Sequence, residues 1–168
     1  MNTNFFLLVF EFFFIIRKKI LLYLCLLVFF YFIVNCLIIN VERTDLNSLL
    51  NNTINLLGIL LGFIASIFTV IITIDNENIR EAKNNKDVKS IYKNNISIYD
   101  ELIISFAFLI ILTGILLIFN FLLPLTNFEI SVFRVIFSID LSLIIFSIIH
   151  LISCILNFYF IISKNKNK

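Results

Sequence analysis

Residues Asn51 to Ile74 read NNTINLLGILLGFIASIFTVIITI and form an amphipathic stretch on which the interpretation of the whole chain depends. On a helix with about 100° per residue, the small and polar residues fall on one face and branched aliphatic residues fall opposite. The small-residue face consists of Asn51, Asn55, Gly58, Gly62, Ser66, Thr69 and Thr73. Leu56 to Ile74 carries no charge, and a run of about 20 such residues can cross a bilayer. We therefore expect lipid to cover the aliphatic face and protein or water to cover the small-residue face.

The composition is typical of an integral membrane protein. Of the 168 residues, 61% are hydrophobic and only 14% are charged, which lies far from soluble globular usage. The net charge of +2 comes from several short segments, so nucleic acid is not an expected partner. The three cysteines, Cys25, Cys36 and Cys154, are odd in number and form no CxxC pair. We expect buried free thiols, with no disulfide framework, metal or cofactor.

The apolar runs predict an all-α membrane protein, a bundle of four transmembrane helices that forms one domain over residues 1–168. The expected spans are about 20–39, 56–74, 102–123 and 141–162. A charged loop at 75–100 is expected to be partly helical. Residues 5–16 are too short to cross a membrane alone, so they predict an N-terminal interfacial helix or the first part of a longer one.

Two local signals mark the end of the third span and the start of the last helix. Pro124 should end the third span, and Thr126-Asn127-Phe128-Glu129 has the spacing of a capping box that would start the next helix. Residues 127–140 then form an outer amphipathic extension.

The distribution of Lys and Arg predicts the orientation. Three basic residues follow the N-terminal block, five lie in the central loop and three lie in the C-terminal tail, whereas only Arg43 and Arg134 lie on the other side. Basic residues favour the cytoplasmic side. Both termini and the central loop are therefore expected in the cytoplasm, most simply at a bacterial cytoplasmic membrane.

A second polar arc lies on the last helix and contains Asp140, Ser147, His150, Cys154 and Asn157, while Asn120 is the polar residue near the end of the third span. His150 is expected near the middle of the membrane, where an ionisable side chain indicates a proton relay or ion path. The alternative is a neutral imidazole bonded to Ser66, Thr113 or a backbone carbonyl. Asp140 is expected nearer the outer boundary, solvated or paired with Arg43 or Arg134.

The Gly58 and Gly62 pair forms a GxxxG motif that Ser66 extends, and such small residues let helices approach closely in lipid. Packing within the chain's own bundle is the ordinary interpretation, and a dimerisation seam or pore lining is the functional one. Catalysis is not expected, because the sequence shows no metal-ligand spacing, phosphate loop or nucleophile with a base at a recognisable spacing.

The run LLGILLGFIASIFTVIITIDNENIREAKNNKDVKSIY at 56–92, followed by another apolar span, resembles a pattern in small four-span bacterial membrane proteins. The resemblance implies a comparison with the small multi-span effectors of bacterial defence and toxin systems, which permeabilise membranes. Our first hypothesis is a homo-oligomeric channel or membrane-perturbing effector. The alternative is a non-conducting accessory or immunity-type protein that binds a partner. The expected partners are the lipid bilayer and a second copy or another membrane protein.

Overall fold

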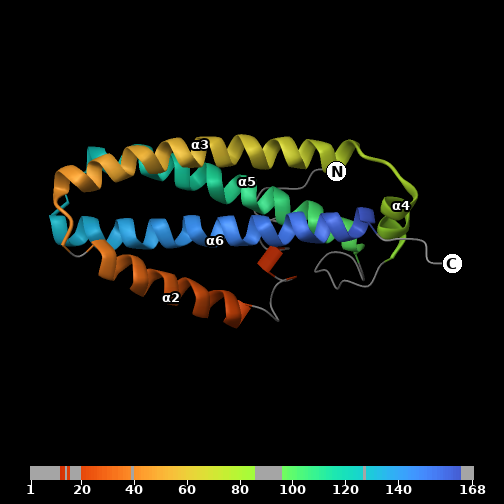
Figure 1. Ribbon diagram of the computed structural model, residues 1–168, viewed down its shortest axis with the longest axis horizontal. Helices are drawn as coiled ribbons and strands as arrows, with labels where there is room; N and C mark the ends of the chain where they lie inside the picture. Colours follow the sequence, from red (N-terminus) through yellow and green to blue (C-terminus); the bar gives the residue numbers. More distant parts are fainter. Residues whose placement is uncertain are drawn as a thin grey trace.

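The computed structural model describes residues 12–13, 15, 20–38, 40–85, 96–126 and 128–163. Its elements are helices (Figure 1), with these bounds: α2 Ile20–Ile38, α3 Arg43–Thr73, α4 Glu77–Asn84, α5 Ile98–Leu122, the short 3-10 helix η2 Leu123–Leu125, and α6 Ile130–Ser163. The predicted all-α class is confirmed. The helices at Thr44–Thr73, Ile98–Leu125 and Ile130–Ser163 are long and apolar enough to cross a membrane.

The first predicted span, about 20–39, corresponds to a helix whose apolar part is shorter than those of the other three. α2 is helical over Ile20–Ile38, but its apolar part, Tyr23–Ile38, is shorter than the three long candidate spans. A membrane-crossing role for α2 stays a prediction, as does the orientation of the bundle. The predicted N-terminal helix falls mostly outside the described residues, and only Phe12, Phe13 and Ile15 of that block are described, each as helical.

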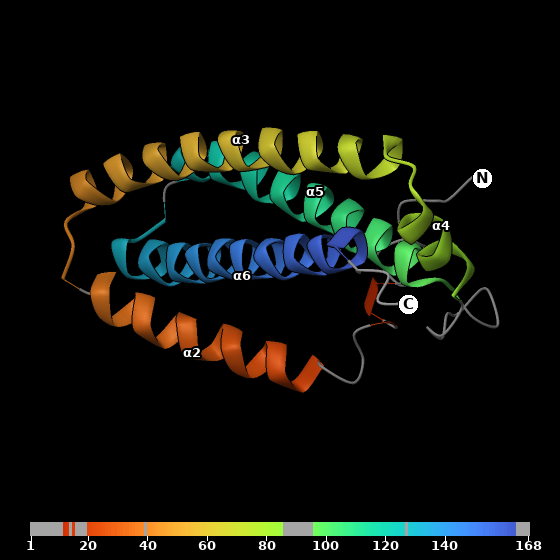
Figure 2. The same ribbon diagram turned by 45° about the vertical axis from the view of Figure 1, so that its right-hand side comes forward.

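The helices form a packed series in which most neighbours in space are not neighbours in sequence. α3 packs on α5, α5 on α6, and α6 on α2, as Figures 1 and 2 show. The helix α4 and the end of α6 lie at one end of the bundle, and the α2–α3 and α5–α6 links lie at the other. We call these the α4 end and the link end.

Helix boundaries follow local hydrogen bonding. α5 begins with a capping box in which the Ser97 hydroxyl accepts from the Asp100 N–H and the Asp100 side chain accepts from the Ser97 N–H. It ends before Pro124, as expected. The predicted capping box at Thr126 is wrong. Its hydroxyl donates to the Leu123 carbonyl at 2.7 Å within the 3-10 turn, and α6 starts only at Ile130.

The core is built mainly from aliphatic and aromatic side chains of α2, α3, α5 and α6. Ile64 and Ile71 of α3 are fully buried in one cluster with Phe106 and Leu109 of α5. A second cluster at the link end combines residues from α2, α3 and α6 with η2, and its members are Val34, Ile38, Leu46, Leu50, Leu123, Phe133 and Phe137. Because lipid tails are as apolar as these side chains, van der Waals packing rather than transfer out of water holds such helices together in a membrane.

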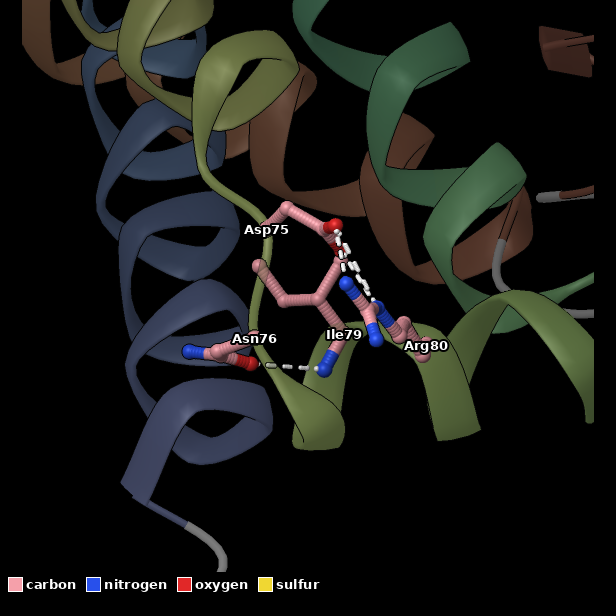
Figure 3. A network of polar contacts seen from close by, with 4 residues as sticks. All are labelled: Asp75, Asn76, Ile79 and Arg80. Carbon is pink, nitrogen blue, oxygen red and sulfur yellow. Dashed lines mark hydrogen bonds and ion pairs between the residues drawn. The ribbon is translucent and has the colours of Figure 1, made fainter.

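The short helix α4 is fastened to the ends of the long helices. Asn76 caps it by accepting the Ile79 N–H at 2.8 Å, and the Ile79 side chain is fully buried (Figure 3). Arg80 donates to the exposed Asp75 carboxylate at 2.7 Å. These hydrogen bonds lower the pKa of Asp75 below its usual value. The Asn78 side-chain amide donates to the Ile162 carbonyl at 2.7 Å, which ties α4 to the last turn of α6.

Candidate functional site

The small-residue face of α3 lies on the outer surface of the chain. All seven of its residues are exposed, whereas Leu57, Ile64 and Ile71 on the opposite face have no exposed surface. The expectation that lipid would cover the aliphatic face is therefore wrong for the single chain. The physical reason is contact area, because branched side chains interdigitate with those of α5 while the small residues offer little to pack.

The backbone and hydroxyl groups of this face are already satisfied within α3. Ser66 donates to the Gly62 carbonyl at 2.8 Å, Thr69 to the Ala65 carbonyl at 2.9 Å, and Thr73 to the Thr69 carbonyl at 2.9 Å. A Cβ added at Gly58 or Gly62 would meet nothing within 4 Å. The ordinary interpretation was that the GxxxG motif packs inside its own bundle. In the structure, the motif instead faces away from the other helices of the chain.

Asn120 and Asp140 meet between α5 and α6. The Asn120 side-chain amide donates to both Asp140 carboxyl oxygens, at 2.9 and 3.0 Å, and also to the Leu116 carbonyl at 2.8 Å. Asn120 is fully buried and Asp140 is 2% exposed. The predictions for Asp140, solvation or a salt bridge with Arg134, are wrong, because Arg134 donates to the Val41 carbonyl at 2.7 Å. The Arg43 side chain lies outside the described residues.

His150 sits among aromatic rings in the middle of the bundle. Ring centroids of Phe12, Tyr23 and Phe146 lie 5.3, 5.9 and 6.0 Å from that of His150. The Cys154 sulfur lies 3.9 Å from the His150 Nε2. The two hydroxyl partners predicted for His150 bond elsewhere: Ser66 faces outward from α3, and Thr113 donates to the Leu109 carbonyl.

An apolar layer separates the Asn120–Asp140 pair from the buried polar residues Ser147 and His150 farther along α6. Leu57, Leu116 and Ile144 form a buried cluster, and on α5 and α6 it lies one turn from Asn120 and Asp140 respectively. Ser147 follows one turn later and donates to the Leu143 carbonyl at 2.8 Å. The polar arc of α6 thus faces α5 and is interrupted, while the polar face of α3 points away. Among the described residues of a single chain, the two arcs line no common path.

Toward the α4 end the structure has a partly open cavity of about 640 Å³. α4, α5 and α6 line most of it, and Ile15 and Tyr23 complete the described lining. His150, Cys154 and Ser105 contribute polar atoms to its wall, and Asn157, exposed on α6, also borders it. Of the candidates chosen from the sequence, the cavity therefore collects His150, Cys154 and Asn157 but neither Asp140 nor Asn120.

Sequence reasoning missed several residues that shape this end. Tyr99 of α5 donates its hydroxyl to the Ile71 carbonyl at 2.9 Å, satisfying one of the last carbonyls of α3, and the Lys83 ammonium lies 4.8 Å from the centroid of the same ring. Hydropathy carries no signal for such end-to-end contacts. Cys25 and Cys36 are exposed on α2, so the expectation of buried thiols is right for Cys154 alone. Within the described ranges, no three His, Cys, Asp or Glu side chains converge as metal ligands.

Comparisons with protein-family models, curated proteins and solved structures find no match for this chain. The geometry of the chain itself therefore carries the functional argument.

Proposed function

We propose that the protein is an integral membrane protein that works as a homo-oligomer assembled through the small-residue face of α3, with both termini and α4 in the cytoplasm. The observation that carries the proposal is the outward position of this face, with open space around Gly58 and Gly62. A glycine surface on a membrane helix lets a second helix approach closely, which maximises backbone contact in lipid.

The chemistry of the face favours a second copy as the occupant. It carries no charge, and its Asn51 and Asn55 amides each offer both a donor and an acceptor. A two-fold axis places the same residues opposite one another, so an amide near the axis meets an amide that can complement it. A partner of another sequence needs a matching face of its own, whereas a second copy supplies one automatically.

The same geometry indicates where conduction would take place. Because Leu57, Leu116 and Ile144 form a buried apolar cluster within one chain, a channel or membrane-perturbing assembly would conduct between copies, along α3. In this proposal the polar face of α3 lines the shared path and the polar arc of α6 stays inside each chain. We propose no catalytic role.

Reconstitution in liposomes at a controlled protein-to-lipid ratio tests the assembly. Gly62→Leu should abolish energy transfer between copies labelled with donor and acceptor dyes, because the larger side chain blocks close approach. Gly114→Leu is the matched control, since Gly114 of α5 also has open space around an added Cβ but lies off this face. Equal energy transfer in the Gly62→Leu variant and the native chain would contradict the proposal. A potentiometric dye in the same liposomes reports conduction.

A second candidate is a non-conducting protein that binds another membrane protein through the same face. The hydrogen bonds of Ser66, Thr69 and Thr73 within α3 favour it, because a face whose hydroxyl protons are already donated offers shape rather than an ion path. It predicts a monomer in detergent, instability without the partner and no conductance. Energy transfer between copies in the absence of other proteins would exclude it.

A further inference from the structure

The buried carboxyl group of Asp140 receives fewer hydrogen bonds than an ionised carboxylate can accept. Both of its oxygens face one atom, the Asn120 Nδ2, at 2.9 and 3.0 Å. That nitrogen carries two hydrogens, and one of them is directed to the Leu116 carbonyl at 2.8 Å. The two carboxyl oxygens therefore share a single N–H, whereas an ionised carboxylate has about four sites for hydrogen bonds.

The helices that pack against α6 bring no described cation to Asp140. α2 contains no charged residue, and on α5 the charged residues are Asp100 and Glu101, in the first turn, at the opposite end of the helix from the contact with Asp140. α3 bears its two charged residues, Arg43 and Asp45, in its first turn. Asp45 is exposed, and the Arg43 side chain lies outside the described residues. α4 packs near the other end of α6.

The polar groups of α6 itself also leave Asp140 to Asn120. The Arg134 guanidinium donates to a backbone carbonyl of the α2–α3 link at 2.7 Å. The hydroxyl groups of Ser138 and Ser142 donate to carbonyls of α6 at 2.7 and 2.6 Å. His150 lies about 15 Å farther along the helix axis. Since Asp140 is only 2% exposed, an ionised form would carry a desolvated charge with one shared N–H, which is strongly unfavourable.

A protonated carboxyl group matches the hydrogen-bonding groups at this position. The Asn120 Oδ1 has no hydrogen-bond partner among the described residues, although Asn120 is fully buried. This oxygen belongs to the same amide group whose Nδ2 contacts Asp140. A carboxylic O–H can therefore donate to Oδ1 while the carboxyl C=O accepts the N–H. The resulting ring of two hydrogen bonds satisfies the acceptor that the ionised form leaves unpaired.

We propose that Asn120 and Asp140 form a proton-binding site, in which Asp140 carries its proton at neutral pH and joins Asn120 through two hydrogen bonds. The proton is then part of the attachment of α5 to α6. The folded chain holds a proton that the unfolded chain releases at the same pH, so the free energy of unfolding falls as the pH rises. The inference is independent of self-association through α3, because neither residue belongs to α3.

Infrared difference spectroscopy of the full chain in phosphatidylcholine liposomes tests for this proton, because protonated and ionised carboxyl groups absorb in separate bands. At neutral pH, the spectrum of the native chain minus that of Asp140→Asn should contain one carboxylic-acid band. Asp45→Asn is the matched control, since Asp45 is exposed. Its difference spectrum should show the loss of a carboxylate and no acid band.

A second variant locates the proton. Asn120→Leu keeps the acid and removes its partner, so the acid band should remain and move to higher frequency. If Asp140→Asn does not fold, aspartate labelled with carbon-13 at the carboxyl carbon identifies the band in the native chain.

Three results would overturn the proposal. The first is an Asp140 signal confined to the carboxylate region at neutral pH. The second is an acid band that does not move in Asn120→Leu, which would separate the proton from this pair. The third is loss of the acid band on addition of sodium chloride at constant pH, which would assign the site to a sodium ion instead.

Discussion

Asn120 of α5 and Asp140 of α6 join their helices from inside the bundle, with the Asn120 Nδ2 at 2.9 and 3.0 Å from the two carboxyl oxygens of Asp140. The same amide also donates to the Leu116 carbonyl. Its Oδ1 has no partner among the residues that the structure describes. The pair is therefore a fixed link between two helices in an otherwise apolar neighbourhood.

Replacement of Asp140 should separate the effect of this hydrogen bond from that of the charge. Asp140→Leu removes this acceptor and leaves the Asn120 amide with only its bond to the Leu116 carbonyl, so the free energy of unfolding should fall by about 1 to 2 kcal/mol. Asp140→Asn keeps an acceptor oxygen and should cost less than about 1 kcal/mol. Unfolding in mixed micelles with increasing sodium dodecyl sulfate measures both. Equal losses in the two variants would mean that the charge, rather than the hydrogen bond, matters.

The hydroxyl of Tyr99 should stabilise the junction between the end of α3 and the start of α5. Tyr99→Phe removes its bond to the Ile71 carbonyl and leaves that carbonyl without this donor. We expect a loss of about 1 kcal/mol in the free energy of unfolding. Tyr159→Phe is the control, because Tyr159 is 61% exposed and should change stability little. A similar effect of the two substitutions would show that the hydrogen bond from Tyr99 to the Ile71 carbonyl adds no measurable stability.

The link between Asn78 and Ile162 should control how often α4 detaches. Asn78→Ala removes the donor to the Ile162 carbonyl, and a loss of about 1 kcal/mol would raise amide exchange in Glu77–Asn84 by about fivefold. Hydrogen exchange followed by mass spectrometry measures the rates. Exchange in the interior of α5 should stay as in the native chain. The control Asn52→Ala, at an exposed position off the small-residue face, should leave exchange unchanged throughout the chain. Acceleration spread evenly over all helices would instead indicate general destabilisation.

Asp75 should titrate below the usual range of an aspartate, because Arg80 donates hydrogen bonds to it. Since the folded pKa is lowered, the interaction supports the folded state above the ordinary aspartate pKa. Its contribution is lost as the pH falls through the lowered value. Carbon NMR of the Asp75 carboxyl group follows this titration. Arg80→Gln should move the pKa upward, and an unchanged titration would show that the ion pair does not persist in solution.

The sequence predicts individual helices well and their faces poorly. Charge-free runs locate α3, α5 and α6, and Pro124 locates the end of α5, because these depend on local chemistry. The direction in which α3 turns its small-residue face does not follow, since lipid accepts aliphatic side chains as readily as a protein core does. Hydropathy therefore cannot distinguish the inside of a membrane bundle from its outside.

Contacts between helices were also beyond local reasoning. Asn120 lies close to the α5–α6 link, whereas Asp140 lies ten residues into α6 after Ile130. In a tight helical hairpin, residues equally far from the link lie opposite each other. On that basis Asn120 would meet a residue nearer the start of α6 than Asp140. The offset arises from the 3-10 turn and the extended backbone of Thr126 that follows it. The cavity depends on the register of α4, α5 and α6 together, for which single helices hold no signal.

The packing of α2 against α6 has a consequence for biosynthesis. α2 emerges from the ribosome on the order of 100 residues before the start of α6, a delay of roughly 5 to 20 s at ordinary rates of translation. During that interval its α6-facing side, with Val34, Asn35 and Ile38, lacks the contacts that α6 provides. Insertion of the last helix is therefore the step that completes the bundle. A ribosome stalled before Ile130 would leave α2 available for pairing with other membrane helices.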